Sequence, residues 1–337
     1  MNDITAQRLR YNAIDGLRAY SSIGIILMHV LANGNYGLSG FVFEKLIPSF
    51  TNLVFLFMIV SAFSMCCGYF DKIIGNKISV VEFYSKRYAK IWPFFALLCV
   101  LDFIISPSKN ALFEVFANLT LCFGLLPAPD ISVIGVGWFL GLVFVFYLIF
   151  PFFCYLISDK KRACFSFVIT LIFNYLCTVC FNAGRGNIIY SAVFFLAGGL
   201  IFLYKEEIII FAKKNHLLIL VAITGLLVIY YIISSKEPVM LALFASMLIY
   251  ALKDAERVGV LYNPVTKFLS GISMEIYLSH MVIFRIIEKL GMTKLFASDL
   301  LSYMLAAAGT IVGTVVFSIT VRKILAVMAL KIQQYIY

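Results

Sequence analysis

Long apolar stretches recur along the whole chain, and they exclude most ways in which it could fold. Ten stretches of near-membrane length lie at about residues 17–34, 50–70, 91–106, 138–157, 163–182, 187–204, 216–234, 238–252, 268–288 and 300–330. A helix of about 20 apolar residues crosses the hydrocarbon core of a bilayer. Since 63% of the 337 residues are hydrophobic and only 13% are charged, too little polar surface remains for a soluble protein. The sequence therefore predicts an all-α integral membrane protein with about ten transmembrane helices.

The lysines and arginines indicate which loops face the cytoplasm. Most of the 27 lie in alternate loops between the apolar stretches, and the other loops hold Lys45, Lys109, Arg185, Lys236, Lys289 and Lys294. Cytoplasmic loops carry an excess of positive charge, so this bias predicts that both termini are cytoplasmic. We expect one membrane-embedded domain over residues 1–337, with a short cytoplasmic segment at 1–13, in a multi-pass protein of the plasma or inner membrane.

The formal net charge of +10 does not indicate nucleic-acid binding. The basic residues are confined to short loops, without the long basic tract or interleaved aromatic residues of a nucleic-acid-binding surface. We therefore expect membrane lipids, and no nucleic acid, among the partners of this chain.

Residues 111–137 break the regular pattern of spans. This stretch begins apolar, but Pro127, Pro129, Gly135 and Gly137 then make it loop-like. Non-helical backbone at membrane depth is tolerated only where protein or a water-filled cavity covers it. We therefore predict an outer-face or re-entrant segment here. A full crossing would instead reverse the predicted side of the C-terminus.

Two polar side chains on the first apolar stretch are the strongest functional signal. Arg18 and His29 are eleven residues apart, which is about 16 Å along a helix. A histidine inside a membrane is costly and indicates function by default, although it can also serve helix packing. Because imidazole titrates near neutral pH, His29 is our candidate general base. Arg18, three residues after Asp15, is our candidate for binding an anion.

A cluster of basic and aromatic residues follows the second apolar stretch. Arg87 and Lys90 are three residues apart, so they share one helix face and can hold one anion together. With Lys86 they form a candidate phosphate-binding patch, and the alternative is an ordinary cytoplasmic positive belt. The neighbouring rings that could stack on a nucleotide base belong to Tyr84, Tyr88 and Trp92.

The ninth apolar stretch carries several ionisable groups, which rarely face lipid. Tyr277 and His280 are three residues apart and could line a cavity together. For Glu275 and Arg285 we favour a structural network with neighbouring helices.

Four motifs occur along the chain in an order typical of one family. They are Ile14-Asp15-Gly16-Leu17-Arg18 followed by His29, then Lys86-Arg87-Tyr88-Ala89-Lys90-Ile91-Trp92-Pro93, then Trp138-Phe139-Leu140 with Tyr147 and Pro151, and Ile276-Tyr277-Leu278 with His280. In these motifs, which run from residue 14 to about 285, the chain resembles the acyltransferase-3 family of membrane acyltransferases. The arginine, ten further residues and the histidine are the most specific part of the resemblance.

The resemblance implies a ten-helix enzyme that transfers an acyl group, commonly acetyl from acetyl-CoA, to a glycan hydroxyl. By the same resemblance His29 would be the catalytic histidine, and Arg18 and Arg87 would lie near the donor. The chain departs from the family at Lys90, where arginine is usual, and at Ala62, where a glycine usually follows Ser61. Lysine cannot make the bidentate phosphate contact of arginine. Alanine at 62 puts close backbone approach in doubt there.

We therefore expect an O-acetyltransferase of the cell envelope that modifies a surface polysaccharide or its lipid-linked precursor. Acetyl-CoA is the expected acyl donor, and we predict no metal. The expected roles are catalysis for His29 and donor binding for Arg18, Lys86, Arg87 and Lys90. The expected supporting residues are Asp15, Ser61, Trp138, Glu275, Tyr277 and His280. Tyr277, Ser61 or a backbone amide would stabilise the oxyanion.

Two alternatives remain open from the sequence. The first is a secondary transporter or lipid flippase with a polar path formed by Arg18, His29, Glu275, His280 and Arg285. No inverted repeat or matched pair of broken helices supports it. The second is the same chemistry with another acyl group, such as succinyl, or another acceptor, such as a lipid headgroup or small glycoside.

Overall fold

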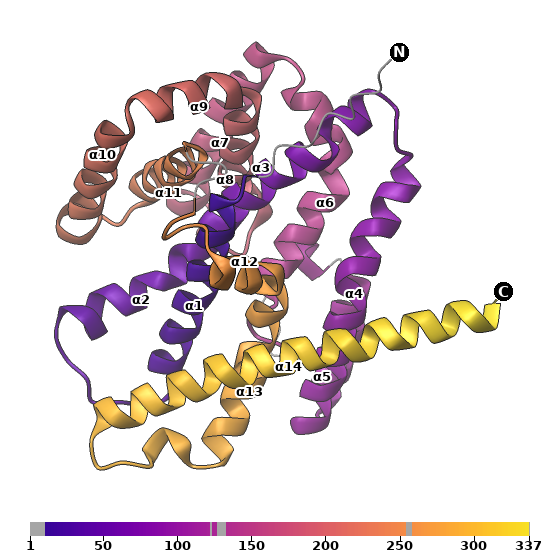
Figure 1. Cartoon of the computed structure of the whole chain (residues 1–337), viewed down its shortest axis with the longest axis vertical. Coiled ribbons are helices and arrows are strands. Elements are labelled where there is room, and N and C mark those ends of the chain that lie inside the picture. The colour runs from indigo at the N-terminus through magenta and orange to yellow at the C-terminus, as the bar shows by residue number, and fades with distance from the viewer. Residues whose placement is uncertain (1–10, 122, 127–132, 254–257, 337) are drawn as a thin grey trace.

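The structure, a computed structural model, consists of helices joined by turns and loops, with no strand, in the residues that it describes, which are 11–121, 123–126, 133–253 and 258–336 (Figure 1). The predicted cytoplasmic segment 1–13 therefore lies mostly outside the described residues. The principal helices are α1 (Ala13–Asn33), α2 (Ile47–Ser49), α3 (Leu53–Ile74), α4 (Val80–Ile105), α5 (Lys109–Thr120), α6 (Trp138–Ile157), α7 (Lys160–Val179), α8 (Ile188–Leu203), α9 (Lys205–Lys214), α10 (His216–Val228), α11 (Glu237–Leu252), α12 (Pro264–Gly271), α13 (Ser273–Lys289) and α14 (Asp299–Ile336).

Seven helical segments in the described residues are long and apolar enough to cross a membrane. Two further pairs, α8 with α9 and α12 with α13, are bent by 80° and 72° and raise the number to nine if each pair is one span. The remaining apolar helix, α11, has only 16 residues. The structure thus confirms the all-helical, multi-span class, whereas the count of ten and the orientation of the termini stay predictions.

Side-chain caps set the start of several helices at the residues that the sequence supplies for this purpose. The hydroxyl of Ser79 accepts from the backbone N–H of Glu82 at 3.0 Å and begins α4. The amide oxygen of Asn187 accepts from the N–H of Ile189 at 2.8 Å and begins α8. Such caps satisfy donors that have no partner within the helix. They place Arg87 and Lys90 of α4 at defined helical positions and set where the segment before α8 ends.

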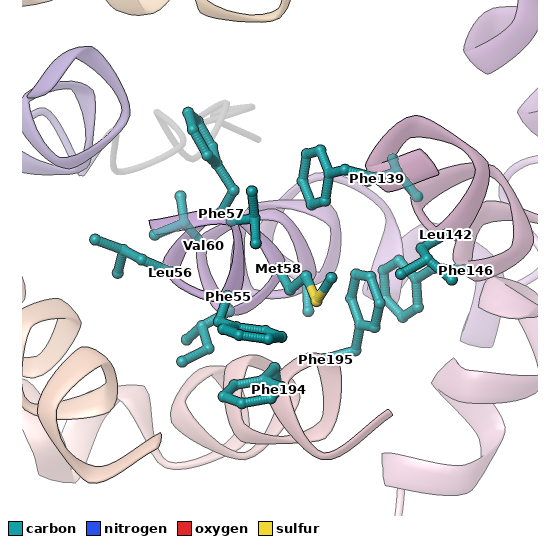
Figure 2. Close-up of a cluster of buried hydrophobic side chains, with 14 of the residues drawn as sticks. Phe55, Leu56, Phe57, Met58, Val60, Phe139, Leu142, Phe146, Phe194 and Phe195 are labelled. Atoms are coloured by element: carbon teal, nitrogen blue, oxygen red, sulfur yellow. The ribbon is translucent and has the colours of Figure 1, made fainter. Parts of the chain in front are cut away.

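Aromatic side chains of α3, α6 and α8 pack together in the core of the bundle (Figure 2). Phe55 stacks on Phe194 with 4.3 Å between ring centroids, and Phe146 stacks on Phe195 at 4.2 Å. Helices in a bilayer associate through such close packing, because lipid tails are as apolar as the side chains. Phe57, by contrast, projects from the side of α3 opposite Phe194 (Figure 2), and its ring centroid lies 6.0 Å from that of Phe139. That face of α3 borders the candidate site.

A glycine lets α8 approach α3 closely. A Cβ atom on Gly198 would lie 2.2 Å from the carbonyl oxygen of Ile59 and 2.9 Å from the Cβ of Ala62. Only glycine fits at such a distance. Close backbone approach near Ala62 is therefore present, although this chain has alanine where the family usually has glycine. The glycine that permits this close approach, Gly198, lies on α8.

Helix α1 is enclosed by α3, α12, α13 and α14, which positions both of its functional side chains. A Cβ on Gly16 would lie 2.3 Å from the carbonyl oxygen of Leu261, so the motif requires glycine here. The buried carboxylate of Asp15 accepts a hydrogen bond from Ser270 Oγ at 2.7 Å. Asp15 and Gly16 thus dock α1 on α12 and on the turn that precedes it.

The described part of the stretch 111–137 contains only a short α-helix, and its outer-face or re-entrant placement stays a prediction. Helix α5 has twelve residues, about 18 Å of helix, which is shorter than the roughly 30 Å hydrocarbon core. Residues 122 and 127–132, with Pro127 and Pro129, lie outside the described residues. The returning segment 133–137 then leads into α6.

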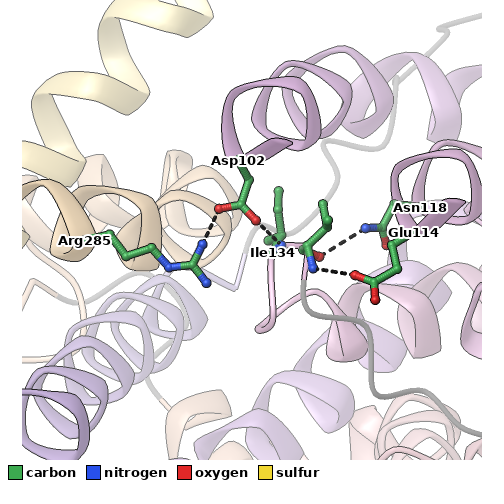
Figure 3. A network of polar contacts seen from close by, with 6 residues as sticks. Asp102, Glu114, Asn118, Ile134 and Arg285 are labelled. Atoms are coloured by element: carbon green, nitrogen blue, oxygen red, sulfur yellow. Dashed lines mark hydrogen bonds and ion pairs between the residues drawn. The ribbon is translucent and has the colours of Figure 1, made fainter. Parts of the chain in front are cut away.

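Polar side chains from three helices hold this returning segment (Figure 3). Asp102 of α4 accepts from the N–H of Ile134 at 2.9 Å and forms an ion pair with Arg285 of α13. Glu114 accepts from the N–H of Val133 at 2.9 Å, while Asn118 donates to the Val133 carbonyl at 3.1 Å. The non-helical backbone is therefore satisfied by protein. Arg285 joins a structural network, as we favoured, with Asp102 as its partner.

Candidate active site

His29 opens into a cavity of about 1030 Å³, which we call the histidine cavity. Residues of α1 and α3 form one side of it, and the segment around residues 181–188 forms another. Its polar lining residues in the described part of the chain include His29, Thr51, Trp138, Asn182, Arg185, Asn187 and Tyr277. The imidazole therefore borders a space large enough for a sugar-sized molecule.

A second cavity, of about 460 Å³, lies towards the other end of α1. We call it the arginine cavity, because Arg18 and Arg87 both line it. Lys72, Lys90 and Glu275 complete its charged lining among the described residues, and Ser61 also borders it. Four cations face one carboxylate here, so the cavity favours an anionic ligand.

The two arginines of this cavity are held differently. Arg18 donates to Ser64 Oγ at 2.7 Å. The Arg87 guanidinium lies 4.2 Å from the ring centroid of Tyr69 and 5.8 Å from that of Tyr147, within the range of cation–π attraction. The buried Nε of Arg87 has no hydrogen-bond acceptor in the described residues. A buried donor without a partner is costly and is free to bind an anion.

Three aromatic rings that contact one another line the arginine cavity, and one of them also lines the histidine cavity. Tyr277 lines both cavities, and its ring contacts Phe139 at 5.2 Å and Phe57 at 6.4 Å between centroids. Phe57 and Phe139 line the arginine cavity. We call these three residues the aromatic boundary. The Tyr277 hydroxyl donates to the Val136 carbonyl at 2.8 Å, so its only hydrogen is not directed at a developing oxyanion.

His280 lies beside His29, with 5.1 Å between the ring centroids. Its Nδ1 donates to the carbonyl of Tyr277 at 2.6 Å, which fixes the tautomer and leaves Nε2 without a proton. This Nε2 is fully buried and has no hydrogen-bond partner in the described residues. The neighbouring His29 ring carries an N–H that is complementary to such an acceptor.

Some predicted site residues are not brought to either cavity. Lys86 does not line the arginine cavity, and its ammonium pairs instead with Glu82 at 2.5 Å on the same exposed helix face. The three predicted stacking rings are also elsewhere. Tyr84 donates to the Leu148 carbonyl, Tyr88 packs on Phe144, and Trp92 donates to the Leu119 carbonyl.

Sequence reasoning missed several lining residues. Ser64 and Tyr69 stand on α3 with Ser61 at intervals of three and five residues, close to one helix face. The polar positions in this otherwise apolar span were the signal that could have revealed them. Arg185 was counted only as a loop charge, and nothing in its local sequence places it over the histidine cavity. In the described residues, no group of three or more His, Cys, Asp or Glu side chains could hold a metal ion.

Comparison with known families matches residues 11–322 to the acyltransferase-3 family, whose model is described as an acyltransferase domain. No curated protein and no solved structure matches the chain. The match covers nearly the whole chain and includes both cavities, together with the motifs at Arg18, His29, Arg87 and His280. This chain therefore belongs to the acyltransferase-3 family of membrane acyltransferases.

Proposed function

We propose that this protein is a membrane O-acetyltransferase that transfers an acetyl group from cytoplasmic acetyl-CoA to a hydroxyl of a surface polysaccharide or its lipid-linked precursor. The observation that carries the proposal is the placement of two cavities along α1, one cationic and one bordered by His29, with Tyr277 common to both. A long anionic donor and a hydroxyl acceptor can thus reach the same region from opposite sides.

On the donor side, the arginine cavity binds the phosphates of acetyl-CoA. Arg18 and Arg87 offer planar donor groups that match phosphate oxygens, while Lys72 and Lys90 add point charges. The positive-inside bias of the sequence supports a cytoplasmic location for this cavity, on the side where acetyl-CoA is available. In this arrangement the pantetheine arm extends from the phosphates past the aromatic boundary towards His29.

On the acceptor side, His29 removes the proton of the sugar hydroxyl as its oxygen attacks the thioester carbonyl. The tetrahedral intermediate then collapses, the carbon–sulfur bond breaks, and His29 returns the proton to the departing CoA thiolate. The products are an acetyl ester and free CoA. The Ser61 hydroxyl and backbone amides are the candidates for oxyanion stabilisation, because the Tyr277 hydroxyl donates to Val136.

His280 acts in this proposal as a positioning residue. Its Nε2 has no partner in the described residues and lies beside the His29 ring, and in the reacting complex it accepts an N–H of His29, so that the other ring nitrogen of His29 faces the acceptor hydroxyl. The imidazolium formed during the reaction strengthens this hydrogen bond. The chain thus uses a neutral imidazole in the place where many hydrolases use a carboxylate.

The Arg87→Gln variant tests the donor site. Since Arg87 lines the cavity with an unpaired buried donor, its loss should raise the KM for acetyl-CoA about tenfold or more and change kcat less. Initial rates at several acetyl-CoA concentrations, with purified protein in lipid nanodiscs, give both constants. Lys86→Gln is the matched control, because Lys86 lies one residue away but pairs with Glu82. An equal KM increase in both variants would contradict the assignment of the donor site.

The His280 variants test the positioning role. Removing one net hydrogen bond should lower kcat about tenfold in His280→Ala and leave the KM for acetyl-CoA unchanged. His280→Gln keeps an acceptor oxygen, so it should recover part of kcat. A lower kcat with an unchanged KM, and partial recovery of kcat in the glutamine variant, would distinguish a positioning role from a general packing defect. Equal activities of the alanine and glutamine variants would remove the hydrogen bond from the mechanism.

Reconstituted vesicles with labelled acetyl-CoA on the cytoplasmic side test the function as a whole. We expect the label as an alkali-labile ester on glycan from the same cells. Flux of glycan or lipid across the membrane without labelled ester would favour the transporter or flippase alternative. Mass spectrometry of surface glycan from cells with and without the chain should show a difference of one acetyl group per modified unit.

A further inference from the structure

Arg185 gives the histidine cavity a charge that the acyl-transfer chemistry at His29 does not require. It belongs to the segment Asn182-Ala183-Gly184-Arg185-Gly186-Asn187, all of which lines the cavity. The glycines on either side of Arg185 carry no side chain that could cover it, and Arg185 is exposed to the cavity and solvent. A guanidinium therefore lines the same cavity as His29.

Two contacts hold the guanidinium in place. Arg185 Nη1 donates to Thr51 Oγ1 at 2.5 Å, and the guanidinium carbon lies 5.1 Å from the centroid of the Trp138 ring. A guanidinium has five N–H donors, so most of them remain available. Thr51 and Trp138 come from different segments, and both line the same cavity. The arginine is thus oriented rather than loosely solvated.

No protein carboxylate neutralises this charge in the described part of the chain. Arg185 has no ion pair there, and the described lining of the histidine cavity contains neither aspartate nor glutamate. The arginine cavity differs, because Glu275 faces its cations. An oriented, unpaired guanidinium in a cavity is complementary to an oxyanion, which it can bind through two parallel hydrogen bonds.

We propose that the acceptor of this enzyme carries an anionic group, a carboxylate or phosphate, which Arg185 binds so that a neighbouring sugar hydroxyl lies at His29. The inference rests on the proposed function for the role of His29. It adds the substrate class, an acidic glycan, and a specificity-determining residue. Loss of Arg185 removes binding of the anion and not the acid–base chemistry.

Trp138 offers a direct test, because the chain has only two tryptophans. In a Trp92→Phe background, Trp138 beneath Arg185 is the single indole that reports on the site. The protein is placed in phosphatidylcholine nanodiscs, and the fluorescence emission of Trp138 is measured as a ligand is added. The ligands are methyl glucuronide, the neutral methyl glucoside and inorganic phosphate. This measurement needs no acetyl-CoA, so failure of the proposed acyl transfer would not imitate failure of this inference.

We expect a saturable response to methyl glucuronide or phosphate at a concentration at least tenfold lower than for methyl glucoside. The response should weaken as salt is added. It should disappear in Arg185→Gln and persist in weaker form in Arg185→Lys, because lysine keeps the charge and loses the fork geometry. Lys236→Gln, which removes an exposed charge outside the cavity lining, is the matched control and should leave the response unchanged.

Three outcomes would overturn the proposal. They are equal responses to the charged and neutral sugars, no saturable response to either anion, and an unchanged response in Arg185→Gln. A further arm replaces part of the phosphatidylcholine with phosphatidylglycerol. If the anionic lipid alone gives the Arg185-dependent change and abolishes the response to the soluble anions, the partner of Arg185 is a lipid headgroup, and the acidic-acceptor assignment is wrong.

Discussion

Replacing His29 with alanine is expected to lower acetyl transfer by about 10²–10⁴-fold, the usual contribution of a positioned general base. His29 borders the histidine cavity and has the buried acceptor of His280 beside it. Alanine removes the only imidazole that reaches this cavity in the described residues. The measurement is the rate of labelled acetyl ester formation at saturating acetyl-CoA, with the amount of inserted protein determined in parallel.

His216→Ala is the matched control for this experiment. His216 is exposed at the start of α10, where its ring nitrogen lies 3.4 Å from the Lys213 carbonyl of the same turn. Its loss should leave acetyl transfer within the experimental error. Glycan acetylation at the wild-type level in the His29 variant would refute the catalytic role, and an equal loss in both variants would indicate a general defect.

Replacing Asp102 with alanine should cause the largest loss of stability. Asp102 is 3% exposed, pairs with Arg285 and accepts from the N–H of Ile134. Removing one partner of a buried ion pair typically costs about 3–5 kcal/mol, because the other charge is left uncompensated. We expect the lower end of this range, because the remaining Arg285 side chain is 33% exposed. Unfolding of the purified protein in detergent, followed by denaturant or heat, measures the change. Activity should fall too, because the segment 133–137 also holds Tyr277 through Val136.

Two further variants distinguish the contribution of the ion pair from that of the hydrogen bond to Ile134. Asp102→Asn keeps an acceptor for Ile134 and should therefore lose less stability than the alanine variant. Glu82→Gln removes an exposed ion pair with Lys86 and should change stability little, since solvent screens such pairs. If Asp102→Ala unfolds at the same point as Glu82→Gln, the network of α4, α13 and residues 133–137 contributes no stability.

Much of the candidate site could be predicted from local sequence. The arginine–histidine spacing marked α1, because a helical rise turns eleven residues into a separation of about 16 Å. Helical spacing also predicted that Arg87 and Lys90 act together. Of the basic and aromatic residues around them, only these two line the arginine cavity. Lys86 precedes Arg87 by one residue, so it points about 100° away around the helix. The spacing alone did not decide which face meets α3.

Contacts between segments that are far apart in the chain could not be predicted from local sequence. Arg185 meets Thr51 and Trp138, and Asp102 meets Arg285, across many intervening residues. These pairings depend on how helices pack, and packing in a bilayer is decided by side-chain shape rather than by hydrophobic periodicity. The apolar spans of this chain are similar in composition, so their sequence carries little information about which neighbours they choose.

The amino-acid sequence by itself determined the membrane class, the approximate positions of the helices and the motifs of the acyltransferase-3 family. These depend on local properties: the length of apolar runs, capping residues, and the spacing of polar groups along a helix. Only the tertiary structure decided that His29 meets His280, that Tyr277 lies between two cavities and that Arg185 stands over one of them. Those facts arise from the close packing of helices far apart in the chain, in which glycines such as Gly16 and Gly198 allow contacts that no other residue would permit.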